Sequence, residues 1–180
     1  MRRVGGVDPS LQSTGLAIIT EVGTPELRTF LSTTTLRVPV DKTISHPALA
    51  EVERVREIVD TLCTSLHGCE AVYVESPAYA SRTGKYAERA HLYFALLAAL
   101  TVRRVTVETV TPAQLKKRVT GNGRAGKEDI INTVRDRWSA HGWVDTPKLG
   151  VSDRADASAL AWVAAVEHGF DVEEPVKRST

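Results

Sequence analysis

Residues 4–20 have the sequence VGGVDPSLQSTGLAIIT, in which two short apolar runs flank a polar turn. The runs Val4–Val7 and Gly15–Thr20 have the length and composition of β-strands. The segment Leu27–Val38 has the same character and follows after a short connection. We therefore expect the chain to open with an antiparallel three-stranded meander, with Asp8 at the end of its first strand.

Outward from this meander, helical and strand patterns alternate. Ala71–Glu75 is a continuous apolar run, typical of a strand buried on both faces of a sheet. From Pro47 to Leu66, apolar residues beginning at Val52 recur at helical spacing. Thr111 and Pro112 are typical of a helix start, and Gly121 ends that short helix. The remaining expected elements are a strand at Val105–Val110 and helices at Tyr86–Val102, Lys127–Trp138 and Asp153–His168.

This order predicts an α/β fold with a mixed five-stranded sheet flanked by helices. We expect one domain over residues 1–170 and a flexible tail over 171–180. The helix Tyr86–Val102 is apolar nearly all round, so we expect both the sheet and a second copy of the chain to cover it. No run of about 20 apolar residues is present, which predicts a soluble, cytoplasmic protein without a membrane partner.

Four acidic residues occupy positions with little structural use for a charge. Asp8 and Glu75 each end a buried strand, and Asp153 and Asp156 open an Ala-rich helix. A carboxylate buried alone costs several kcal/mol, so it needs a cation. Oxygen ligands of this kind suit Mg²⁺ or Mn²⁺, and two ions about 4 Å apart can hydrolyse a phosphodiester.

Two of these acids also have a purely structural explanation. Asp153 directly precedes the Ala-rich run, where Asp is a preferred N-cap, and the helix dipole would stabilise Asp156 in the first turn. Cys63, His67 and Cys69 resemble soft-metal ligands, but a fourth ligand is missing and we expect them to serve packing.

The charges along the chain are unevenly distributed. Between Ser76 and Lys127 there are ten basic and two acidic residues, a net charge of +8, and the rest of the chain carries −7. A basic segment beside an acidic cluster is what a phosphate-binding surface requires, although a solvated helix face gives the same pattern.

The element order is that of a ribonuclease H-like domain. Four strings also resemble, in the same order, the motifs of the RuvC family of Holliday-junction resolvases: GVDPSLQSTGLAII from Gly6, VYVES from Val72, TPAQLKKRVTGNGRAGK from Thr111 and DRADASALA from Asp153. The resemblance implies a homodimeric, Mg²⁺-dependent endonuclease that nicks opposed strands of a four-way DNA junction. It implies that Asp8, Glu75, Asp153 and Asp156 are the metal-binding catalytic acids, and that Lys116 and Lys127 lie close to the scissile phosphate.

The chain also departs from the family pattern. Ser10 stands where cellular members have glycine, and Ala78 stands where they have a phenylalanine wedge. The glycine-rich helix motif near Arg89 is absent. These departures resemble a phage-type branch and leave junction selectivity and a branch-migration motor partner open. The residues we expect to contact DNA are Tyr79, which could stack on an unpaired base, and Arg82, Lys85, Lys117, Arg118 and Arg124.

Three other functions remain open at this point. The turn after Asp8 resembles the first phosphate loop of actin-like sugar kinases, but those enzymes need two such domains. A transposase or another ribonuclease H-like nuclease would use the same acids. A DNA protein that binds junctions without cleaving them would be expected if one acid were missing, and all four are present.

Overall fold

The computed structural model describes residues 1–23, 27–77, 86–145 and 148–175. Its strands are β1 (Arg2–Asp8), β2 (Thr14–Gly23), β3 (Leu27–Leu36), β4 (Ala71–Glu75) and β5 (Thr106–Val110). Its helices are α1 (Pro47–Ser65), α2 (Tyr86–Val102), α3 (Pro112–Thr120), α4 (Lys127–Trp138) and α5 (Val151–Glu167). Every element expected from the sequence is present, with ends that differ by a few residues.

The strands form one mixed sheet in the order β3-β2-β1-β4-β5. The strands β1, β2 and β3 pair antiparallel, which confirms the predicted meander. The strand β4 pairs parallel with β1 on one side and with β5 on the other. The carboxyl ends of β1 and β4 therefore meet at one edge of the sheet, where α/β proteins commonly bind their ligands.

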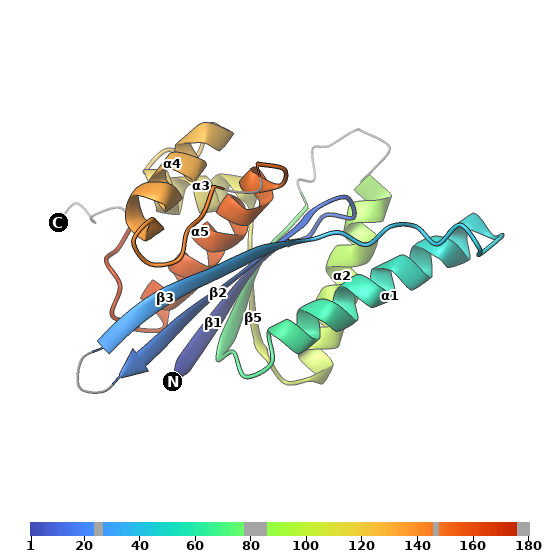
Figure 1. Cartoon of the computed structure of the whole chain (residues 1–180), viewed down its shortest axis with the longest axis horizontal. Coiled ribbons are helices and arrows are strands. Elements are labelled where there is room, and N and C mark those ends of the chain that lie inside the picture. Colours follow the sequence, from blue (N-terminus) through green and yellow to red (C-terminus); the bar gives the residue numbers. More distant parts are fainter. Residues whose placement is uncertain (24–26, 78–85, 146–147, 176–180) are drawn as a thin grey trace.

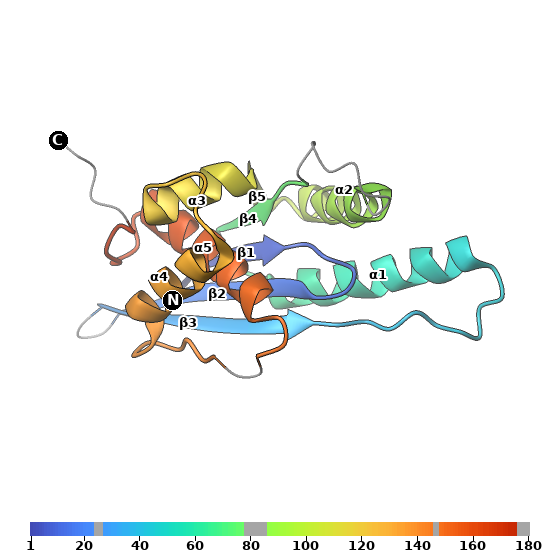
Figure 2. The same cartoon turned by 90° about the horizontal axis from the view of Figure 1, so that it is seen from above.

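Helices cover both faces of the sheet (Figures 1 and 2). The helices α1 and α2 enclose an apolar core on one face, and α3, α4 and α5 enclose a second core on the other. Neighbouring residues of β1 point to opposite cores because side chains alternate along a strand. Gly5 faces Leu66 beyond α1, whereas Gly6 faces Ala157 and Leu160 of α5.

Three expectations about element ends and exposure need correction. Val52 was expected on the buried stripe of α1, but it is 47% exposed because this end of the helix extends past the sheet. Helix α5 begins at Val151 and not at Asp153. The packed part of the chain continues past residue 170, since the Asp171 amide donates to Glu21 and the Trp162 indole donates to the Glu173 carbonyl.

No helix in the described parts of the chain is long and apolar enough to cross a membrane.

Candidate active site

The two strand-ending acids lie side by side. Val7 of β1 pairs with Val74 of β4 in a parallel register, and each is followed by a carboxylate, Asp8 or Glu75. Both preceding valines are fully buried, so the apolar runs fix where the two strands end. This register puts the two acids on neighbouring strands at the same end of the sheet.

Two glycines bring α5 against the sheet. A Cβ atom at Gly6 would clash with the backbone of Ala157 and Ala161, and one at Gly15 would clash with the carbonyl group of Asp153. Only a residue without a side chain allows the helix backbone to approach this closely. The glycines on β1 and β2 therefore hold the first turns of α5 beside the end of β1.

The other two acids lie on these first turns. Asp153 is the third residue of α5, and Asp156 follows one turn later on the same face. Gly150 occupies the N-cap position with a φ of 78° and no side-chain cap. The capping explanation for Asp153 is therefore wrong, because the helix begins two residues before it.

Burial and mutual repulsion raise the pKa values of three of these carboxyl groups. For Asp8 the main cause is burial, followed by repulsion from Asp156 and Asp153. For Glu75 burial is again first, followed by repulsion from Asp8 and Asp156. Burial, opposed mainly by Lys127, raises the pKa of Asp156 to about 6. These shifts mean that the acids form one electrostatic cluster that lacks enough positive charge.

The donor set fits a hard divalent cation. Within the described ranges, none of the four carboxylates has a hydrogen bond or an ion pair. No three His, Cys, Asp or Glu side chains among the described residues lie close enough to enclose an ion by themselves. Mg²⁺ keeps several waters and uses one or two carboxylates together with substrate phosphates. The cluster therefore suits an ion whose remaining ligands are water molecules and a phosphate oxygen.

Two lysines approach the cluster from α3 and α4. Lys127 stabilises the charged forms of Asp8, Glu75 and Asp156, and Lys116 does so for the last two. Thr111 caps α3 in a reciprocal bond with Gln114, its amide donating to the Gln114 Oε1 at 2.9 Å. A capped helix start of this kind fixes where α3 begins, and therefore the direction in which the Lys116 side chain extends from the helix.

A family model matches the sequence that carries this site. The model "Crossover junction endodeoxyribonuclease RuvC" covers residues 4–164. The chain belongs to the RuvC family. A RuvC of Mycolicibacterium vanbaalenii, described as a crossover junction endodeoxyribonuclease, is 35% identical over 159 residues, which are 88% of this chain and 76% of the relative.

Solved structures of RuvC have the same fold. The Thermus thermophilus RuvC structure superposes with a TM-score of 0.69 at 25% identity, over 97% of this chain and 99% of that one. T. thermophilus RuvC in complex with a Holliday junction substrate gives a TM-score of 0.67 at 24% identity, over 93% and 96% of the two chains. The predicted ribonuclease H-like fold and the predicted family are both confirmed.

The residues expected to contact DNA differ in their exposure and in their partners. Arg118 forms an ion pair of 3.0 Å with Glu167 at the far end of α5, so its guanidinium is already engaged away from the acids. Lys117 and Arg124 are exposed. Three further expected contacts, Tyr79, Arg82 and Lys85, lie outside the described residues.

Two further arginines near the acids had no individual role in the sequence-based predictions. Arg89 of α2 stabilises the charged form of Asp8. Arg154, which is 2% exposed, donates to the Thr35 hydroxyl at 3.2 Å and to the Leu149 carbonyl at 3.3 Å. The first thus adds positive charge to the site, and the second ties the start of α5 to β3. A basic residue next to a predicted metal ligand was the available signal for Arg154. Arg89 was counted only within the basic segment from Ser76 to Lys127, because nothing in its local sequence distinguishes it from the other basic residues there.

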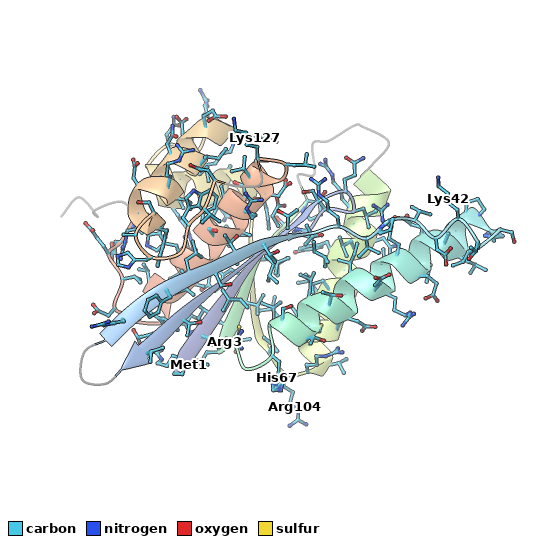
Figure 3. All side chains as sticks on the ribbon, viewed as in Figure 1. Met1, Arg3, Lys42, His67, Arg104 and Lys127 are labelled. Atoms are coloured by element: carbon cyan, nitrogen blue, oxygen red, sulfur yellow. The ribbon has the colours of Figure 1, made fainter. Side chains whose placement is uncertain are left out.

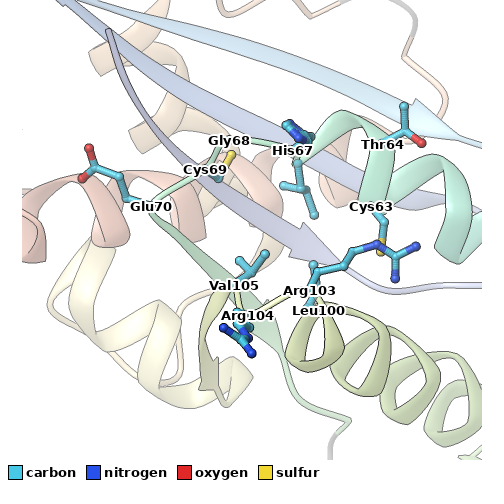
Figure 4. A pocket seen from close by; sticks show the side chains of 11 residues that line it. Cys63, Thr64, His67, Gly68, Cys69, Glu70, Leu100, Arg103, Arg104 and Val105 are labelled. Atoms are coloured by element: carbon cyan, nitrogen blue, oxygen red, sulfur yellow. The ribbon is translucent and has the colours of Figure 1, made fainter.

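The cysteines lie at the opposite end of the sheet. Cys63 and Cys69 line a pocket of about 660 Å³ with His67, Arg103 and other residues (Figure 4). Both thiols are buried, and burial raises their pKa values. Their surroundings agree with the packing role expected from the sequence.

Proposed function

We propose that this chain resolves four-way DNA junctions by metal-dependent hydrolysis of one phosphodiester in each of two opposed strands. The observation that carries the proposal is the parallel register that puts Asp8 beside Glu75, with Asp153 and Asp156 on the helix packed against β1 and β2. Among the described residues, none of these four carboxylates has a hydrogen bond or an ion pair. Excess negative charge next to lysine side chains suits metal ions and a phosphate backbone together.

Each residue has a separate task in this proposal. Asp8, Glu75, Asp153 and Asp156 hold two Mg²⁺ ions, for which Mn²⁺ can substitute. When bound, such ions supply an activated water and stabilise the leaving oxygen. Lys127 and Lys116 stabilise the charge that develops on the phosphate. The expected products carry a 5′-phosphate and a 3′-hydroxyl, which a ligase can seal.

Two opposed cuts require two active sites, and we assign the dimer contact to α2. Leu92, Leu96 and Leu100 of this helix are buried against the sheet. Its other side exposes Phe94 at 59% and Val102 at 81%. We call the end of the sheet where Asp8 and Glu75 end β1 and β4 the catalytic edge. A two-fold dimer would bury the exposed side of α2 and place the two catalytic edges symmetrically. The proposed site of action is the cytoplasm, where branched DNA forms.

A cleavage assay tests this proposal. Four-way, three-way, flap and linear duplex DNA are incubated with the protein and Mg²⁺, and the nick positions are mapped on every strand. We expect symmetric nicks in the four-way junction and much slower cutting of linear duplex. Equal cutting of all substrates would favour a general ribonuclease H-like nuclease, and tight junction binding without nicks would favour a binding protein.

A further inference from the structure

The position of Arg89 follows from the direction of α2. The strand β5 runs parallel to β4, so the connecting helix α2 runs back from the catalytic edge to the opposite edge. Leu92 and Tyr93 of α2 belong to the same apolar core as Val7 and Val74. Arg89 precedes them by one helical turn, of about 5.4 Å, and so lies toward the catalytic edge.

The side chain of Arg89 is available for a ligand. It is exposed, and it has no hydrogen bond or ion pair in the described part of the chain. Other arginines are engaged, such as the exposed Arg56 with Glu53 at 2.7 Å and the half-buried Arg135 with Asp145 at 3.0 Å. On the first turn of α2, the Arg89 charge lies toward the end of the sheet at which Asp8 and Glu75 end β1 and β4.

Arg89 and the two lysines lie on opposite faces of the sheet. The helix α2 covers one face, whereas α3 and α4, which carry Lys116 and Lys127, cover the other. We propose that Arg89 contacts a DNA phosphate from the α2 face, so that the strand at the catalytic edge is held from both sides. This inference rests on the proposed function for the identity of the ligand as DNA.

The proposed dimer specifies which phosphate this is. Because the dimer contact also runs along α2, the two-fold axis lies on the Arg89 side of the catalytic edge. The phosphate that meets Arg89 therefore lies between the scissile phosphate and the centre of the junction. The contact is made to the backbone, so it adds affinity and register but no base preference.

A salt titration of junction binding tests the contact. Binding is measured with Ca²⁺ in place of Mg²⁺ for the parent, Arg89→Ala, Arg89→Lys and Arg103→Ala, the last an exposed control at the other end of α2. Each phosphate contact contributes about 0.9 to the slope of log K against log salt. We expect Arg89→Ala to lower the slope by about that amount and to weaken binding roughly tenfold at 50 mM salt and roughly threefold at 200 mM. We expect Arg89→Lys and Arg103→Ala to keep the parent slope.

Neutral methylphosphonates then locate the contact. Substitution one or two phosphates from the scissile position toward the junction centre should weaken the parent but barely change Arg89→Ala, whereas Lys127→Ala should remain sensitive. An unchanged salt slope for Arg89→Ala would overturn the inference. So would a loss of affinity on methylphosphonate substitution that is as large in Arg89→Ala as in the parent at every phosphate tested. Junction nicking by the parent is scored separately, so a failure of the proposed function is visible as absent nicks whatever Arg89 does.

Discussion

The carboxylates at the edge of the sheet where β1 begins have hydrogen-bond and ion-pair partners, whereas those at the edge where β1 ends do not have such partners among the described residues. At the edge where β1 begins, Arg2 donates to Glu70 at 3.0 Å and to Glu21 at 3.4 Å, and Arg118 pairs with Glu167 at 3.0 Å. At the edge where β1 ends, the four acids have no such partner among the described residues. Figure 3 shows Arg3, His67 and Arg104 at the first edge and Lys127 at the other end of the molecule.

This difference separates charges that hold the fold from charges that we propose bind a ligand. At the first edge the ion pairs connect the two chain ends, since Arg2 also donates to the His168 carbonyl at 2.7 Å and stacks on Phe170. At the second edge burial and repulsion raise the pKa values of Asp8 and Glu75, which costs stability until a cation arrives. Unrelieved charge of this kind is typical of functional sites.

The largest expected effect is on cleavage at the catalytic edge. Asp8→Asn or Glu75→Gln should reduce junction nicking at least about a thousandfold, because a metal ligand is lost while the fold is kept. Junction binding in Ca²⁺ should persist, because the basic residues carry the affinity. Single-turnover nicking and binding assays measure the two quantities. Loss of both together would indicate misfolding or a misplaced site.

The matched change at the other edge is Glu21→Ala. It should lower the free energy of unfolding by about 1–3 kcal/mol, because the Asp171 amide and Arg2 lose a buried acceptor. Nicking per folded molecule should equal that of the parent. A loss of nicking per folded molecule in Glu21→Ala would mean that the carboxylates at this edge also contribute to cleavage.

The next effect concerns the glycines that seat α5. Gly6→Ala should cost about 3 kcal/mol, because its methyl group meets the α5 backbone, which cannot yield locally. Gly5→Ala, one residue earlier, meets only the end of the flexible Leu66 side chain and should cost about 1 kcal/mol. Denaturant unfolding compares the two. Equal costs would mean that α5 does not depend on this close approach.

The lysines should affect rate more than affinity. Lys127→Ala and Lys116→Ala should slow nicking roughly 10- to 100-fold while junction binding weakens only a few-fold, since they act on developing charge. Arg118→Ala is the control, because its exposed ion pair with Glu167 contributes less than about 1 kcal/mol to stability. Equal losses of rate and binding would reduce the two lysines to ordinary phosphate contacts.

The smallest effect is the pH dependence of stability without metal. Raised pKa values mean that the folded protein binds more protons than the unfolded chain between about pH 4 and the folded pKa values, so stability falls as pH rises. We expect a loss of about 1–2 kcal/mol between pH 5 and pH 8, less steep in Asp8→Asn. Added Mg²⁺ should stabilise more at pH 8, because it binds the ionised acids. A gain in stability of the metal-free protein between pH 5 and pH 8 would contradict the raised pKa values of these acids.

Local sequence patterns were sufficient for the elements and for the four acids. The apolar run Ala71–Glu75, the Thr111 cap and the stop at Gly121 are short-range signals, and each element lies where it was expected. The resemblance of four strings to one family added the roles of the acids. The first residue of α5 was missed because Gly150, in a left-handed conformation, allows the helix to start before Asp153.

The sequence by itself thus determined the order of the elements along the chain, the family and the carboxylates that end β1 and β4, because strand periodicity and motif spacing are properties of neighbouring residues. Only the tertiary structure decided how the basic residues are arranged around these acids. It pairs Arg118 with Glu167, and it puts Arg89 and Lys127 on helices that cover opposite faces of the sheet. These outcomes depend on helix direction and on the close packing of α5 against Gly6 and Gly15, so no local pattern encodes them.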